Sequence, residues 1–172
     1  MKKFTFLKTQ FTGLTTAVTK SMATLGLLAL GFSYSQAATY YVNDASTVGD
    51  VFTTAVGNNS NSGSSSAPFL TVSYAISVAS SGDIIRIDAG TYNEHVTLFS
   101  KALTFIGAGS STIFTPSTAC VGANNGTFDG FRIHTNNVTL RNVKIMGYDR
   151  GIVVDSRNIV IRGVESSNNC TS

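Results

Sequence analysis

The sequence has 172 residues, of which 42% are hydrophobic and 12% are charged, and this length fits one domain with at most a short tail. Its 12 Lys and Arg residues against 9 Asp and Glu residues give a formal net charge of +3. Four of those lysines precede residue 21. Without them, 8 basic and 9 acidic residues leave a net charge of about −1, so the basic precursor gives no reason to expect nucleic-acid binding.

The first segment, residues 1–37, has the pattern of a secretory signal peptide. Its lysines precede an apolar run over residues 22–32, and Ser35 and Ala37 then provide the small residues that a signal peptidase reads. The run is shorter than the roughly 20 residues that span a bilayer, so we expect no transmembrane anchor after cleavage. The mature protein is therefore predicted to be secreted or at the cell surface. Cys120 and Cys170 could pair there or remain isolated thiols, and the sequence leaves this open.

Residues 38–82 are predicted to form an entry strand, a polar loop and a capping helix. The strand covers residues 39–42, and the Asn-, Ser- and Gly-rich passage up to Ser66 is loop by composition. After Pro68, apolar residues recur at helical spacing until Gly82, which predicts a one-sided helix of about three turns. Such a helix needs an apolar surface to cover, and the strands that follow are the first candidate.

Residues 83–172 read as short strands with no helix between them. Residues 84–87 form a β run, Gly90-Thr91-Tyr92 turns the chain into a second run at 95–98, and a third follows at 103–106. Because no helical pattern intervenes, the crossover helices of a doubly wound α/β fold are excluded. The segment is therefore predicted to be all-β.

An internal repeat with an offset of 21 residues decides the architecture. It keeps glycines, asparagines, arginines and apolar residues in register, from Gly130 over Gly151 to Val143 over Val164. Each period holds three apolar groups, Phe131/Ile133, Val138/Leu140 and Val143/Ile145, each with one outward residue between two inward ones. Three strands in so short a period fit one coil of a parallel β-helix, a solenoid in which Asn137 would stack on Asn158.

Two regions resemble the pectin-lyase-like family of right-handed parallel β-helix proteins. The first runs from Gly57 to Phe69 and continues in the motifs 82–85 and 89–94, and the second is 137–145 with its echo from Asn158. Together they span nearly all of the mature chain. The resemblance implies a right-handed parallel β-helix but is weak for function, because the family includes lyases, hydrolases, epimerases and adhesins.

The family's lyases typically hold Ca²⁺ on outward carboxylates and use an Arg or Lys base, and that set does not map onto this sequence. Asn59 also stands where many relatives have Asp, which speaks against a cation in the entry loop. Ca²⁺ is thus implied by the resemblance alone. The residues themselves indicate no cofactor and no metal-spaced His/Cys cluster.

Six residues are candidates for substrate binding, and no catalytic residue is assigned. Arg141 and Arg162 should stack outward on adjacent coils, a like-charge contact that an anionic sugar would relieve, although two solvated arginines are the plainer interpretation. The other candidates are His134, in register with Asp155, and the turn pair Asp149-Arg150; both pairs also fit ordinary polar turns.

Other charged residues are expected to be structural. Lys144 and Glu165 should form an ion pair between coils, and Glu94 should close the Gly90-Thr91-Tyr92 turn that precedes it.

The sequence predicts a protein that binds, and in an enzymatic version cleaves, extracellular polysaccharide as a lyase or hydrolase. The alternative is a non-catalytic adhesin or structural surface solenoid. Because residue 172 falls inside a coil, the sequence is expected to be the N-terminal piece of a longer chain whose downstream coils would be its partner and carry any active site. Pairing of the open end with a second subunit is a further possibility.

Overall fold

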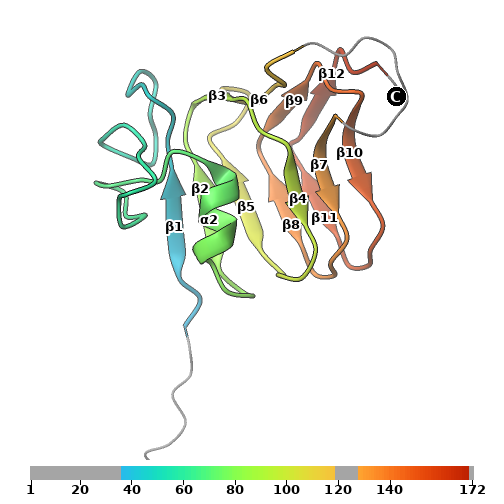
Figure 1. The fold of residues 1–172 in the computed structure, drawn as a ribbon, viewed down its shortest axis with the longest axis horizontal. Coiled ribbons are helices and arrows are strands. Elements are labelled where there is room, and N and C mark those ends of the chain that lie inside the picture. Colours follow the sequence, from blue (N-terminus) through green and yellow to red (C-terminus); the bar gives the residue numbers. More distant parts are fainter. Residues whose placement is uncertain (1–35, 119–127, 171–172) are drawn as a thin grey trace, which may run out of the picture. The chain divides into compact units, whose positions relative to one another are not determined.

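The computed structural model describes residues 36–118 and 128–170. In these residues the protein is built of short parallel strands in three sheets, with one short helix (Figure 1). The elements are β1 (Thr39–Val42), α2 (Val72–Val78), β2 (Ile84–Ile87), β3 (Gly90–Tyr92), β4 (Val96–Leu98), β5 (Thr104–Gly107), β6 (Thr112–Phe114), β7 (Asp129–Ile133), β8 (Thr139–Arg141), β9 (Lys144–Met146), β10 (Arg150–Val154), β11 (Val160–Arg162) and β12 (Glu165–Ser167).

Successive strands go to different sheets, as expected for a parallel β-helix. The five-stranded sheet has the order β1-β2-β5-β8-β11, the four-stranded sheet β12-β9-β6-β3 and the three-stranded sheet β10-β7-β4. The last two coils confirm the predicted repeat, because Ile152 pairs with Phe131 and Ile161 with Leu140, 21 residues apart. The fold is therefore the all-β, parallel β-helix solenoid that the repeat predicts.

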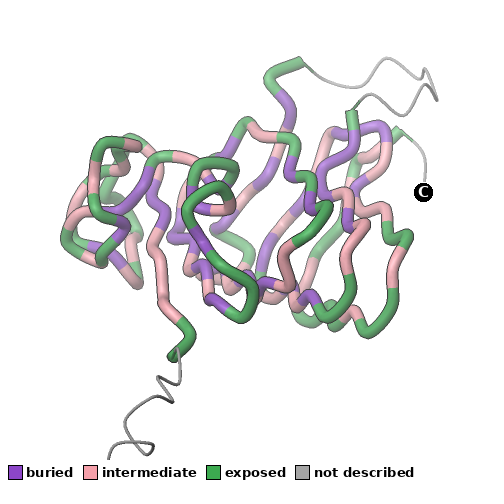
Figure 2. Tube along the Cα trace, turned by 60° about the horizontal axis from the view of Figure 1, so that its bottom comes forward, coloured by how far each residue is buried: buried purple, intermediate pink, exposed green. Residues whose placement is uncertain are grey.

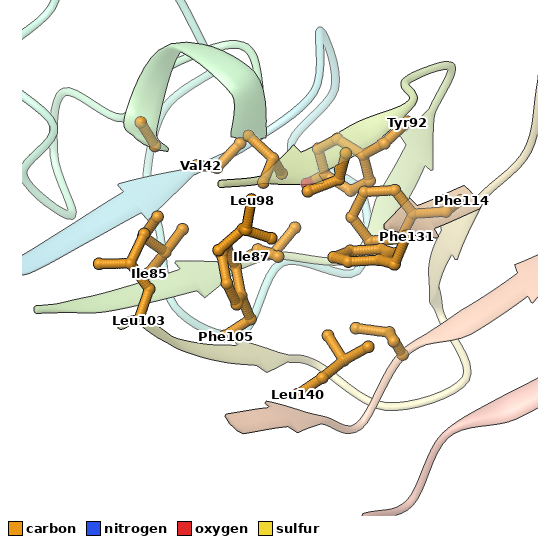
Figure 3. Packing of buried hydrophobic residues seen from close by; sticks show 14 of the residues in the cluster. Val42, Ile85, Ile87, Tyr92, Leu98, Leu103, Phe105, Phe114, Phe131 and Leu140 are labelled. Carbon is orange, nitrogen blue, oxygen red and sulfur yellow. The ribbon is translucent and has the colours of Figure 1, made fainter. Parts of the chain in front are cut away.

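The inward residues of the three sheets form one apolar core. Phe131, Leu140 and Ile145, which belong to three different sheets, are each fully buried. Figure 3 shows how side chains from successive coils fill the interior, where the ring of Phe131 is in edge-to-face contact with both Phe105 and Phe114. Such a core forms only when coils stack, because the inward face of one coil has nothing else to pack against.

Left-handed backbone turns join the strands at equivalent places in successive coils. Asn137 and Asn158 have φ angles of 61° and 58°, and the Asn158 amide donates to the Asn137 side-chain oxygen over 3.1 Å. This is the predicted amide ladder. Asparagine suits the position because its short polar side chain tolerates the left-handed region better than most residues.

The capping helix is shorter than the sequence predicts. It begins after the N-cap Thr71 and covers seven residues, about two turns rather than three. Phe69 is not helical because it forms a parallel bridge with Val42 and lies in the core. The helix packs against β1, β2 and β4, so it does cover the first coil (Figure 1).

Two strands were missed by the sequence interpretation. Residues 90–92, interpreted as a turn, form β3, and residues 112–114 form β6, which pairs with β3 in parallel. Both strands are only three residues long, which is too short for apolar alternation to stand out.

Candidate functional site

An outward column of arginines runs along the five-stranded sheet. Arg86, Arg141 and Arg162 occupy equivalent positions on β2, β8 and β11, with Ile106 of β5 between the first two. The residues before them on β2 and β8, Ile85 and Leu140, are fully buried, so strand alternation directs the arginines away from the core. We call the outward side of this sheet the arginine face.

The charge of the arginine face is of one sign. Its other outward strand residues are hydroxyl-bearing or apolar: Thr39, Tyr41, Ile84, Thr104, Ile106, Thr139 and Val160. Arg86 is steadied by Phe52, whose ring centroid lies 5.1 Å from the guanidinium carbon. Within the described residues, no carboxylate forms an ion pair with Arg141 or Arg162. Two like charges on neighbouring strands repel each other, so an anion bound between them would lower the energy.

His134 and Asp155 come together as predicted. His134 Nδ1 lies 3.3 Å from Asp155 Oδ2, on the turn that follows the three-stranded sheet. On the other side of His134, the ring of Phe99 lies parallel to the imidazole, with centroids 5.2 Å apart. The three side chains thus form a ladder over three successive coils.

The turn pair Asp149-Arg150 is separated by the structure. Asp149 is buried, whereas Arg150 opens β10 and turns to Asp129 of the preceding coil, with Nε 2.7 Å from Oδ1 and Nη2 3.0 Å from Oδ2. The hydrogen bond to Asp129 raises the pKa of Arg150 above its ordinary value. Arg150 is therefore held in a structural ion pair.

The sequence interpretation missed the centre of this cluster. Asp129 is 6% exposed, and its Oδ2 also accepts from Arg132 Nε over 2.7 Å. The backbone oxygen of Asp129 lies 2.9 Å from His95 Nδ1 on the previous coil. The signal was available, because the 21-residue repeat that aligns Gly130 with Gly151 also places Asp129 beside Arg150.

The charged residues that we expected to be structural, Lys144, Glu165 and Glu94, all make contacts within the protein. Lys144 Nζ lies 2.8 Å from Glu165 Oε1, which confirms that ion pair. Glu94 has a different partner from the one expected. Its carboxylate accepts from the backbone N–H groups of Val72 and Ser73 and caps the start of α2 rather than closing its own turn.

The entry loop is held together by protein donors. Asn59 Oδ1 accepts from the N–H groups of Leu70 and Thr71, so this residue ties the loop to the helix start. The described part of the chain contains no group of three or more His, Cys, Asp or Glu side chains arranged to hold a metal ion.

Several predictions concern residues outside the described part. The signal peptide over 1–37 falls almost entirely there, and so does Cys120, whereas Cys170 is disulfide-bonded. Within the described residues, no helix is long and apolar enough to cross a membrane.

The six predicted residues therefore do not form one site. Arg141 and Arg162 lie on the five-stranded sheet, His134 and Asp155 on a turn after the three-stranded sheet, and Arg150 at the start of β10. Only the arginine face combines adjacent like charges with the lack of a described acidic partner. It is therefore the strongest candidate for binding an anion.

Comparison with known proteins supports the fold. A family model described as "Protein of unknown function (DUF1565)", a family associated with right-handed β-helix proteins, matches residues 55–98. This region covers the end of the polar loop, α2 and the strands β2 to β4. No curated protein and no solved structure gave a significant match.

Proposed function

We propose that this protein is secreted or displayed at the cell surface and binds an anionic polysaccharide through the arginine face. The observation that carries the proposal is the stacking of Arg141 on Arg162 without a described carboxylate beside them. Guanidinium groups suit carboxylates because their fork of N–H donors matches the two oxygens. The resemblance to pectin-lyase-like proteins supports an extracellular carbohydrate ligand by analogy.

The spacing of the face favours a polymer over a single small anion. Neighbouring strands of a sheet lie about 4.8 Å apart, and Arg86 extends the same column two strands beyond Arg141. A chain of acidic sugars presents carboxylates at repeated intervals, so it can engage several arginines at once. Multivalent contact of this kind gives useful affinity even when each contact is weak.

The test is binding of polygalacturonate, with a neutral glucan as the comparison ligand. Arg141→Gln combined with Arg162→Gln should weaken binding roughly tenfold or more, since each charge-assisted hydrogen bond contributes about 1.5–3 kcal/mol when well formed. Binding should also weaken with added salt, because salt screens the attraction between the arginines and the carboxylates.

Arg157→Gln is the matched control. Arg157 is exposed on a turn, and its replacement removes one positive charge, as each substitution on the arginine face does. If Arg157→Gln weakens binding as much as the single variant Arg141→Gln or Arg162→Gln does, the effect is one of net charge and the proposed face is wrong. Equal affinity for the neutral glucan would also contradict the proposal.

The enzymatic version needs a separate measurement. A lyase would leave unsaturated uronate ends and a hydrolase would leave only new reducing ends, so product analysis separates the two. The arginine face favours binding over hydrolysis, because its outward strand positions carry hydroxyl, apolar and arginine side chains and no carboxyl group that could act as a general acid. Turnover of the polymer by this chain would favour the enzyme instead.

A further inference from the structure

A second surface feature lies beside β4, on a different sheet from the arginine face. A slot of about 180 Å³ opens between the last turn of α2 and the turn that follows β4. Ile76 and Ser77 line it from the helix, and Thr97, Phe99 and Lys101 line it from the coil. We call this the Phe99 slot.

The aromatic ring at the slot is stacked on His134 and largely exposed. Phe99 is 72% exposed, and the His134 ring lies parallel to it at an interplanar angle of 1°. β4 is the edge strand of the three-stranded sheet, with β7, and hence His134, on one side and α2 on the other (Figure 1). Ile76 and Ser77 of α2 line the slot and His134 does not, so the slot lies on the α2 side of Phe99.

The remaining lining combines the apolar side chains of Ile76 and Leu98 with hydroxyl-bearing residues, and it carries a single positive charge. Ser77, Thr97 and Ser100 offer hydroxyl groups, and Lys101 is the one charged residue that lines the slot. The Lys101 ammonium donates to the backbone oxygens of Ile76 and Ser77 over 2.7 and 2.9 Å. An ammonium group has three N–H donors, so one is left to meet an anion.

We infer that the Phe99 slot binds a single acidic sugar ring, with an apolar ring face stacked on Phe99 and its carboxylate directed to Lys101. A sugar ring combines a flat C–H face with hydroxyl groups, which is the combination that this lining offers. The size fits one ring, since an engineered apolar cavity of about 150 Å³ holds one benzene molecule. The slot therefore selects one residue or chain end and not a long stretch of polymer.

This inference goes beyond the proposed function and does not depend on it. The two surfaces lie on different sheets, so substitutions at Arg141 and Arg162 should leave the Phe99 slot unchanged. Loss of polymer binding to the arginine face would leave single-sugar binding at the Phe99 slot intact. Loss of single-sugar binding at the slot would likewise leave polymer binding intact.

The test is an NMR titration of the ¹⁵N-labelled chain with glucuronate, glucose and benzoate in parallel. Glucuronate should shift the amide signals of Ser77, Phe99 and Lys101, and glucose should bind more weakly because it lacks the carboxylate. Phe99→Leu keeps an apolar side chain but removes the aromatic face, so it should weaken glucuronate binding roughly three- to tenfold. Phe99→Tyr should bind as the unaltered protein does.

The role of the positive charge of Lys101 is tested by Lys101→Gln. Lys144→Gln is the control, because it removes one positive charge elsewhere, at the ion pair with Glu165. Only the first should abolish the preference for glucuronate over glucose. Because Phe99 is exposed, its variants should fold, and the spectra report this directly. Unchanged glucuronate binding in Phe99→Leu, or tighter binding of benzoate than of glucuronate, would overturn the assignment.

Discussion

Asp88 shows how a single buried carboxylate organises the polar loop before the first coil. Its oxygens accept from the backbone N–H groups of Val51, Phe52, Thr53 and Ala89, and from the Thr53 hydroxyl. Burial by itself raises the pKa of Asp88, but hydrogen bonds led by that from Val51 outweigh it and leave the pKa below its ordinary value. The loop therefore depends on the ionised form of this residue.

Acid should remove the contribution of Asp88. A lowered pKa in the folded state stabilises the protein above the unfolded value of 3.8, and this stabilisation is lost as the pH falls through the folded value. Asp88→Asn should cost about 2–4 kcal/mol at neutral pH, because a charged acceptor of several hydrogen bonds is lost. The difference from the unaltered protein should narrow at about pH 2.5. Urea unfolding at the two pH values measures it.

Asp155→Asn is the control, because the Asp155 side chain is 58% exposed and its removal should change stability little. Asp50 contributes with the opposite sign, since burial raises its pKa and its protonation favours the folded state as the pH falls. Comparing variants at the same pH removes most of that background. An equal loss for Asp88→Asn at both pH values would show that ionisation of Asp88 is not what holds the loop.

At the scale of elements, α2 depends on a residue that is distant in sequence. The helix has only seven residues, fewer than an isolated helix needs to be stable in water. Its first free N–H groups are satisfied by Glu94, at 2.8 Å from Val72 and 2.9 Å from Ser73, while Lys101 binds two backbone oxygens from its last turn. Side chains of the first coil thus bind the free backbone groups at both ends of α2.

Loss of the Glu94 cap should destabilise the protein measurably. Glu94→Ala leaves N–H groups at the helix start without their acceptor and should cost about 1–2 kcal/mol. Glu165→Ala removes a carboxylate of the same kind from an exposed ion pair and should cost less than about 0.5 kcal/mol. Thermal unfolding of both variants tests this, and equal losses would contradict a capping role. Hydrogen exchange should also be faster over residues 72–78 in the first variant alone.

The sequence predicted those elements whose signals repeat. The stack from Phe131 to Val164 was found because equivalent residues recur every 21 positions and the structure pairs them in that register. The strands β3 and β6 lie before the regular repeat begins, so nothing aligned them. The helix cap that Glu94 provides was also hidden, because it depends on which segments become neighbours and not on a local pattern. The contact of Asp129 with Arg150, in contrast, follows the 21-residue repeat and could have been predicted.

At the scale of the whole molecule, stability is shared between neighbouring coils. Equivalent inward residues form columns, and their burial depends on having a coil on each side. Leu140 is fully buried between Phe105 and Ile161, whereas Ile161, at the equivalent position in the last described coil, is 42% exposed. Figure 2 shows the same gradient, with fewer buried residues in β11 and β12 than in β8 and β9.

This gradient predicts unequal costs for the same kind of substitution at equivalent positions. Leu140→Ala removes a fully buried side chain and should cost about 2–5 kcal/mol, because it loses apolar burial and leaves a cavity between two coils. Ile161→Ala in the same 172-residue chain should cost about 1 kcal/mol or less, since much of that side chain already faces water. Urea unfolding of the two variants, followed by fluorescence and circular dichroism, measures both costs.

Equal losses would mean that Ile161 is covered in solution by something that packs on the last coil. A dependence of the Ile161→Ala loss on protein concentration would identify a second copy of the chain as that cover.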